Sequence, residues 1–182
     1  MGEAITPEQL SKEAERAYKS KEYLSAAQSY IAAADGYKIS GEEVPAAEMQ
    51  NNASVAYLQG NQPQDALEAA LGTDQVFADA AEIRKQAMAL GNQAAAYEAL
   101  NQLESAARAY QESSDLLKEI GDHELRPAVM QSLSAVQLRQ GQRMDALVTM
   151  QAGLEEIEKP SLKQKLVKKL LQSPFSYFNR LP

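Results

Sequence analysis

The sequence lacks cysteine and tryptophan and has a single histidine, His123, among its 182 residues. Without cysteine, the chain can form no disulfide, no thiolate zinc site and no cysteine nucleophile. One histidine cannot build a multi-histidine metal site, and no glycine-rich phosphate-binding loop follows a strand-like segment. These features predict a protein that is not an enzyme and that needs no metal or cofactor.

Long hydrophobic runs are also missing. No stretch approaches the roughly eighteen consecutive apolar residues of a membrane-spanning helix. The first ten residues, MGEAITPEQL, contain neither the basic nor the apolar region of a secretion signal. We therefore expect a cytoplasmic protein.

Positive charge is scarce and unevenly placed. The formal net charge is -7, which argues against nucleic acid as a partner because a phosphate-binding surface needs a basic field. Residues 161–182 contain five basic side chains and no acid, so the rest of the chain has 13 basic against 25 acidic side chains, a net charge of -12. An acidic body is thus joined to a basic C-terminal segment.

Strand-forming residues are sparse and alanine is frequent, which is typical of closely packed helices. The sequence also aligns with itself at a period of forty residues without a gap. Three of the aligned columns hold small residues: Ala14, Ser54, Ala94 and Ser134; Ala26, Ala66, Ala106 and Ala146; and Ala33, Thr73, Ser113 and Gly153. A fourth column, four residues after the second, holds the apolar residues Tyr30, Ala70, Tyr110 and Met150.

The spacing within these columns predicts one helical hairpin per repeat. A small residue, an apolar residue four positions later and a small residue three further on share one helix face, against which a neighbouring helix packs closely. Most of the residues expected between the two helices tolerate the left-handed conformation of a helix end; they are Lys21, Asn61, Asn101 and Gly141. Thr6 and Gln9 form a capping-box pattern, and Asp122 is a candidate N-cap after Gly121.

The expected organisation is an all-α chain of four repeats with a C-terminal addition. The boundaries are residues 6–40, 45–79, 80–120 and 122–159 for the repeats, 161–172 for an amphipathic capping helix and 173–182 for an aromatic tail. The second boundary, near Asp79, has no glycine or proline signal. In the capping helix, Leu162 and Leu166 belong to an apolar stripe that we expect to cover the last repeat.

The third repeat resembles a tetratricopeptide repeat. Ala94, Tyr97, Ala106 and Tyr110 match that family's motif, and the forty-residue period is similar to the kinesin-light-chain type. The resemblance implies a right-handed α-solenoid that acts as a protein-binding scaffold. Its concave face, lined by the first helix of each pair, would hold a peptide or helix of a partner protein.

Regularly spaced polar side chains are expected on that inner face, where amides can hold a peptide backbone. Acidic residues nearby favour a neutral or basic segment as the ligand. The candidate groove residues are Ser11, Lys12, Glu15, Asn51, Asn52, Val55, Met88, Asn92, Gln131 and Ser132. Asn52 and Asn92 are the two side chains most suited to bind the ligand backbone.

The tail is the most aromatic part of the chain, and three interpretations of it stay open. It could fold back over the capping helix, it could dock in the groove of its own molecule or of a second copy, or it could bind a membrane surface. The residues concerned are Phe175, Tyr177, Phe178 and Leu181. The membrane interpretation gives the alternative function, a membrane-associated adaptor whose architecture resembles the soluble NSF attachment proteins, although the acidic body disfavours it.

Overall fold

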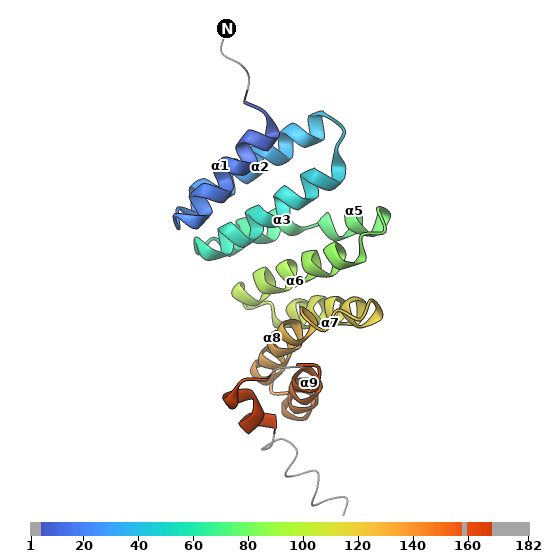
Figure 1. Ribbon diagram of the computed structural model, residues 1–182. Helices are drawn as coiled ribbons and strands as arrows, with labels where there is room; N and C mark the ends of the chain where they lie inside the picture. The colour runs from blue at the N-terminus through green and yellow to red at the C-terminus, as the bar shows by residue number, and fades with distance from the viewer. Residues whose placement is uncertain (1–4, 158–159, 169–182) are drawn as a thin grey trace, which may run out of the picture.

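The structure is a computed structural model that describes residues 5–157 and 160–168, and within these ranges it contains helices and no strands. Figure 1 shows the helices as one stack that follows the order of the chain. The helices are α1 (Pro7–Lys19), α2 (Tyr23–Ile39), α3 (Glu43–Gln59), α4 (Pro63–Ala70), α5 (Thr73–Asp79), α6 (Ile83–Ala99), α7 (Leu103–Glu119), α8 (Arg126–Arg139), α9 (Arg143–Glu155) and a short helix at 162–168.

Neighbouring helices pack in pairs, and each pair packs on the next. α1 packs on α2, α3 on α4, α6 on α7 and α8 on α9, while α2 also contacts α3 and α7 contacts α8. The described part of the chain is therefore an all-α solenoid of helix pairs, which confirms the predicted fold class.

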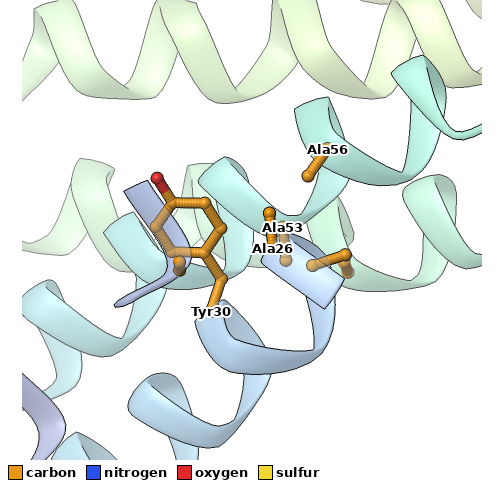
Figure 2. Close-up of a cluster of buried hydrophobic side chains, with 7 residues drawn as sticks. Ala26, Tyr30, Ala53 and Ala56 are labelled. Carbon is orange, nitrogen blue, oxygen red and sulfur yellow. The ribbon is translucent and has the colours of Figure 1, made fainter. Parts of the chain in front are cut away.

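The small residues that recur at forty-residue intervals form the packing surfaces between helices. Ala26, Ala66, Ala106 and Ala146 are all 0% exposed. Figure 2 shows how such alanines are used in the first cluster, where Tyr30 lies beside Ala26 of α2 and near Ala53 and Ala56 of α3. Because alanine lets two helix backbones approach closely, the core of this protein is made mainly of short side chains.

The turns within the pairs have the predicted conformation. Lys21, Asn61, Asn101 and Gly141 have φ angles of 65°, 58°, 59° and 80°. The boundary after the second pair, which no glycine or proline marks, also has a turn with a left-handed residue. There α5 ends at Asp79, and Ala81 has a φ of 58°. Alanine rarely adopts this conformation, which explains why the sequence gives no warning of a turn there.

The second pair departs from the predicted hairpin, because its second helix is broken into α4 and α5. Leu71 is extended, with a ψ of 131°, and Gly72 has a φ of 80°. The carbonyl of Ala70, left without a helical partner, accepts hydrogen bonds from Thr73 Oγ1 at 2.6 Å and from Gln93 Nε2 at 3.1 Å. Gln93 belongs to α6, so the break is stabilised by the next pair.

Two helix ends test the predicted caps. Thr6 and Gln9 form the capping box at the start of α1, as predicted. Asp122 does not cap α8, which begins four residues later; its Oδ1 accepts hydrogen bonds from the backbone N–H groups of Glu124 and Leu125. Asp122 therefore stabilises the turn that leads into α8.

The helix at 162–168 lies at the end of the stack beside α8 and α9 (Figure 1). Its orientation differs from the expected one, because Leu162 is 85% exposed and Leu166 is 61% exposed, while Gln164 and Val167 face the fourth pair. The leucines are thus not what covers that pair. The tail at 173–182, with Phe175, Tyr177, Phe178 and Leu181, lies outside the described residues.

Candidate functional site

A groove of about 330 Å³ opens between α6 and α8, with α7 as its floor. We name it the α6–α8 groove. Its lining residues are Ala87, Met88, Gly91, Asn92, Ala95, Tyr110, Ser113, Leu117, Leu125, Ala128, Val129 and Ser132. The walls are mostly apolar, and Asn92 and Ser132 place polar groups on its two sides. Such a combination binds a ligand by apolar contact and orients it by a few hydrogen bonds.

The forty-residue register explains why the groove opens at this junction. At the preceding junction, Asn92 Nδ2 of α6 donates a hydrogen bond to Asn51 Oδ1 of α3 at 3.0 Å. Forty residues after Asn51 and Asn92 come Gly91 and Ser132. Glycine has no side chain to accept a hydrogen bond, so the equivalent contact between α6 and α8 cannot form.

Space exists for a side chain at Gly91. A Cβ added there would have one neighbour within 4 Å, Ser113 Oγ at 3.7 Å, which is an ordinary contact. Ser113 Oγ is itself occupied, because it donates a hydrogen bond to the carbonyl of Ala87 at 2.7 Å. The glycine therefore creates open volume in the groove and meets no packing requirement of the core.

A hydrogen-bonded network stands behind the groove and joins α6, α7 and α8. The Tyr110 hydroxyl donates to Glu98 Oε2 at 3.2 Å, and Arg139 Nη1 lies 3.0 Å from Glu98 Oε1. Arg139 Nη2 also donates to Asn101 Oδ1 at 2.9 Å. Burial, followed by the charge of Glu98, raises the pKa of Tyr110 to about 12, so the phenol is neutral at physiological pH.

A second cavity, of about 230 Å³, lies between α8, α9 and the helix at 162–168, and we name it the C-terminal cavity. Its lining residues are Pro127, Gln131, Met150, Gly153, Leu154, Ile157, Lys163, Gln164 and Val167. Pro127, Gln131, Met150 and Gly153 stand forty residues after Ala87, Gly91, Tyr110 and Ser113. The C-terminal cavity is therefore the counterpart of the α6–α8 groove, one repeat further along.

The structure brings together only some of the predicted groove residues. Met88, Asn92 and Ser132 line the α6–α8 groove, and Met88 is 46% exposed at its edge. Gln131 lines the C-terminal cavity instead. Asn92 donates one of its two amide hydrogens to Asn51, so only part of the hydrogen-bonding capacity of its side chain remains for a ligand.

The other predicted groove residues lie on earlier helices. On α3, Asn51 is 8% exposed and donates to the carbonyl of Ala47, Asn52 is exposed and Val55 is half-buried. On α1, Ser11 is half-buried, whereas Lys12 and Glu15 are exposed, and Glu15 lies 3.9 Å from Lys19. These residues do not line the α6–α8 groove.

Sequence reasoning missed the residue that creates the groove. Gly91 falls in the same column as Ser11, Asn51 and Gln131, and it differs from them by having no side chain. A glycine in the middle of a helix costs stability, so its presence was the available signal for a close approach or an open space. Tyr110 and Val129 were also missed, because both have the pattern of core residues.

The described residues contain no group of three or more histidine, cysteine or acidic side chains suited to holding a metal ion. Within the same ranges, no helix has the length and hydrophobicity needed to cross a membrane. The described part of the chain offers a solenoid surface with several cavities, including the α6–α8 groove and the C-terminal cavity. This places the protein among the helical-repeat proteins that act by binding other proteins.

The sequence matches the family model "Soluble NSF attachment protein, SNAP" over residues 6–177. The chain therefore belongs to the soluble NSF attachment protein family, and it is a helical adaptor in protein-protein interaction. Among individually curated proteins, none matches the sequence significantly.

Proposed function

We propose that the chain is a non-enzymatic adaptor that holds a segment of a partner protein in the α6–α8 groove. The observation that carries this proposal is the open space at Gly91, flanked by polar side chains on α6 and α8. The name of the family refers to attachment to NSF, and we extend that attachment to this chain. NSF is therefore the first partner to test.

The chemistry of the groove favours an apolar segment that is neutral or basic. The groove lining contains no charged side chain, but Glu98 lies behind Tyr110 and the body of the chain is acidic. A cavity of about 330 Å³ is at the small end of the range for ligand sites, so it suits one or a few apolar side chains of a longer segment. Ser132 can hydrogen-bond to the backbone of such a segment.

The experiment introduces between α6 and α8 the asparagine pair that joins α3 and α6. The double variant Gly91→Asn/Ser132→Asn places asparagines in register with Asn51 and Asn92 and fills the groove. We expect at least tenfold weaker binding of purified NSF, measured by calorimetry, with unchanged or higher thermal stability. The stability should not fall, because the Cβ at position 91 fits and glycine is unfavourable within a helix.

The matched control is Ala99→Asn, which changes an exposed residue at the C-terminal end of the same helix that does not line the groove. NSF binding that is equal in the wild type, the control and the double variant would show that attachment occurs through another surface. A wild-type chain that does not bind NSF would contradict the extension from the family, and the groove would then need a different partner.

Membrane association through the C-terminus is a second candidate function. It rests on one observation, the exposure of Leu162 and Leu166 on a helix that also carries Lys163, Lys165 and Lys168. Cosedimentation with vesicles containing anionic lipid tests it. Binding that is lost in the variant Leu162→Ser/Leu166→Ser would support this function, and equal sedimentation of both proteins would contradict it.

Several finer expectations are kept as predictions. These are the division into repeats at 6–40, 45–79, 80–120 and 122–159, the kinesin-light-chain type of spacing, the cytoplasmic location, self-association through the tail and a ligand path that continues along α1 and α3. For the last of these, Asn52 is the informative residue, because it is exposed on α3. Asn52→Ala should weaken partner binding only if the bound segment extends beyond the α6–α8 groove.

A further inference from the structure

The C-terminal cavity differs from the α6–α8 groove in the chemistry of its floor. That floor consists of Met150, Gly153, Leu154 and Ile157. In the α6–α8 groove, the positions forty residues before the first two of these hold Tyr110 and Ser113, which both carry hydroxyl groups. The later repeat has therefore exchanged a floor with two hydroxyls for one without a polar side chain. Such a floor favours contact with an apolar chain.

The wall formed by the helix at 162–168 shows the opposite change. Each wall contributes three side chains with the same spacing, which are Lys163, Gln164 and Val167 here, and Ala128, Val129 and Ser132 of α8 in the α6–α8 groove. Lys163 thus corresponds to Ala128, and Gln164 corresponds to Val129. A small side chain and an apolar one are replaced by an ammonium group and an amide.

The polar groups of the C-terminal cavity are hydrogen-bond donors. Lys163 is exposed, and Gln131 of α8 supplies a second amide from the other side. Gln164 Oε1 accepts a hydrogen bond from the backbone N–H of Ser161 at 2.8 Å, so the Nε2 group of Gln164 remains as a donor. An ammonium group and two amides with N–H groups to donate match a carboxylate, which only accepts hydrogen bonds.

The acidic body of the chain does not cancel the positive charge at this cavity. Residues 161–182 contain no acid. At the end of α9, Glu156 forms an ion pair with Arg126, and Glu155 accepts a hydrogen bond from Gln151 Nε2 at 3.0 Å. These two carboxylates are therefore engaged with other side chains. A ligand with a single negative charge is electrostatically favoured beside the lysine of the cavity wall.

The volume of the C-terminal cavity limits the size of its ligand. An apolar cavity of about 150 Å³ is sufficient to bind benzene, so a cavity of about 230 Å³ has room for about nine non-hydrogen atoms. A peptide would bring amide groups against a floor that offers them no polar side chain, which is unfavourable. An alkyl chain has no such groups and fits the same space.

We propose that the C-terminal cavity binds a medium-chain fatty carboxylate. The alkyl chain lies on Met150 and Leu154, and the carboxylate lies at the mouth beside Lys163. Gln131 and Gln164 donate hydrogen bonds to the carboxylate from the two sides. This site is separate from the α6–α8 groove, so the proposal does not rest on the proposed function.

Isothermal titration calorimetry of the full chain with octanoate, below its micelle concentration, tests the site, and 1-octanol is the matched ligand without a charge. We expect saturable binding of both, with octanoate preferred. Lys163→Met keeps the aliphatic stem and removes the charge, so it should weaken octanoate binding about fivefold and leave octanol binding unchanged. Lys165→Met, on the same helix but outside the cavity lining, is the control and should change neither.

A second variant tests the floor. Met150→Tyr introduces the residue that α7 has at the equivalent position, Tyr110, and fills the C-terminal cavity. Binding of both ligands should weaken by about tenfold, because the alkyl chain loses its space. Met144→Tyr, at a site of α9 that is 63% exposed, is the control, and circular dichroism verifies that each variant is folded.

Labelling the methionine methyl groups with ¹³C locates octanoate in the wild-type chain without any substitution. The Met150 resonance should shift on titration, and that of Met88, which lines the α6–α8 groove, should not. Absence of saturable octanoate binding, or a shift at Met88 without one at Met150, would overturn the proposal. An unchanged preference for octanoate over octanol in Lys163→Met would also overturn it, because the carboxylate would then have no contact with that lysine.

Discussion

The junction between α3 and α6 and the junction between α6 and α8 are one repeat apart and share the same buried alanine column, yet their polar contacts differ, and the second contains the α6–α8 groove. At the first, Asn92 donates to Asn51 across the two helices. At the second, Gly91 and Ser132 stand at the equivalent positions, and the groove opens there. The comparison shows that small buried residues set how the pairs stack, whereas a few polar positions decide where the surface is open.

Ion pairs occur at both boundaries. α6 meets the second pair through Gln93 Nε2, which donates to Ala70 O and to Asp74 Oδ1, and through Lys85 Nζ, which lies 2.7 Å from Glu48 Oε1 of α3. The third and fourth pairs are joined by arginine and carboxylate, because Arg84 Nε lies 2.8 Å from Asp122 Oδ2 and Arg139 contacts Glu98. The groove is thus bordered by charged contacts whose strength depends on pH and salt.

The largest loss of stability should follow from enlarging the buried alanines that both junctions share. Ala66→Leu and Ala106→Leu each add three carbons to a site that is 0% exposed, so each should lower the free energy of unfolding by about 3 kcal/mol. Chemical denaturation measures both losses, and Ala99→Leu at an exposed site is the control. A large loss at one alanine and none at the other would contradict the equivalence of the two junctions.

That equivalence is the part of the structure that the sequence predicts well. A buried alanine column requires the same residue in every repeat, so the period of forty is visible in one chain. The turns at Lys21, Asn61 and Asn101 are also predictable, because each falls at the same place in its repeat.

Features that depend on contacts between pairs are not predictable in this way. Asn51 has the spacing of an inner-face residue, but Asn92 of the next pair takes its side chain as a partner. The break at Gly72 is stabilised by Gln93, and the turn at Ala81 uses a residue with no left-handed preference. In each case the deciding partner lies in another repeat or in the backbone, where a pattern of residue types gives no signal.

The second-largest effect is a loss of stability at high pH, caused by Tyr110 at the junction between α6 and α8. The pKa of Tyr110, about 12, exceeds its ordinary value of 10.0, so the folded chain keeps a proton that the unfolded chain loses. The stabilisation is complete below pH 10 and is lost as the pH rises from 10 to 12, by about 2 kcal/mol. Denaturation at pH 9 and 11.5 measures the loss, which Tyr110→Phe should reduce. An equal pH dependence in that variant would show that other groups are responsible.

Replacing either of two glycines by alanine should change the stability of the chain, but in opposite directions. Gly72 at the break in the second pair has a φ of 80°, so Gly72→Ala should cost about 1.5 kcal/mol through backbone strain, although nothing lies within 4 Å of the new Cβ. Gly91→Ala, within a regular helix where the Cβ fits, should stabilise the chain by about 0.5 kcal/mol. Thermal unfolding of both variants checks the signs, and a destabilised Gly91→Ala would mean that the groove is already filled in solution.

The smallest effect concerns the hydrogen bond that distinguishes the junctions. Asn92→Ala removes the donor to Asn51 and leaves a buried amide oxygen without that partner, so it should cost about 1 kcal/mol. Ser132→Ala at the equivalent position removes a contact with the Tyr110 hydroxyl and should cost less, because that hydroxyl keeps Glu98 as a partner. Paired denaturation curves measure the difference. If both substitutions cost the same, the contact of Ser132 with Tyr110 is worth as much as the amide contact, and the amide contact is not what distinguishes the junctions. If only Asn92→Ala is costly, the amide contact is what closes the earlier junction.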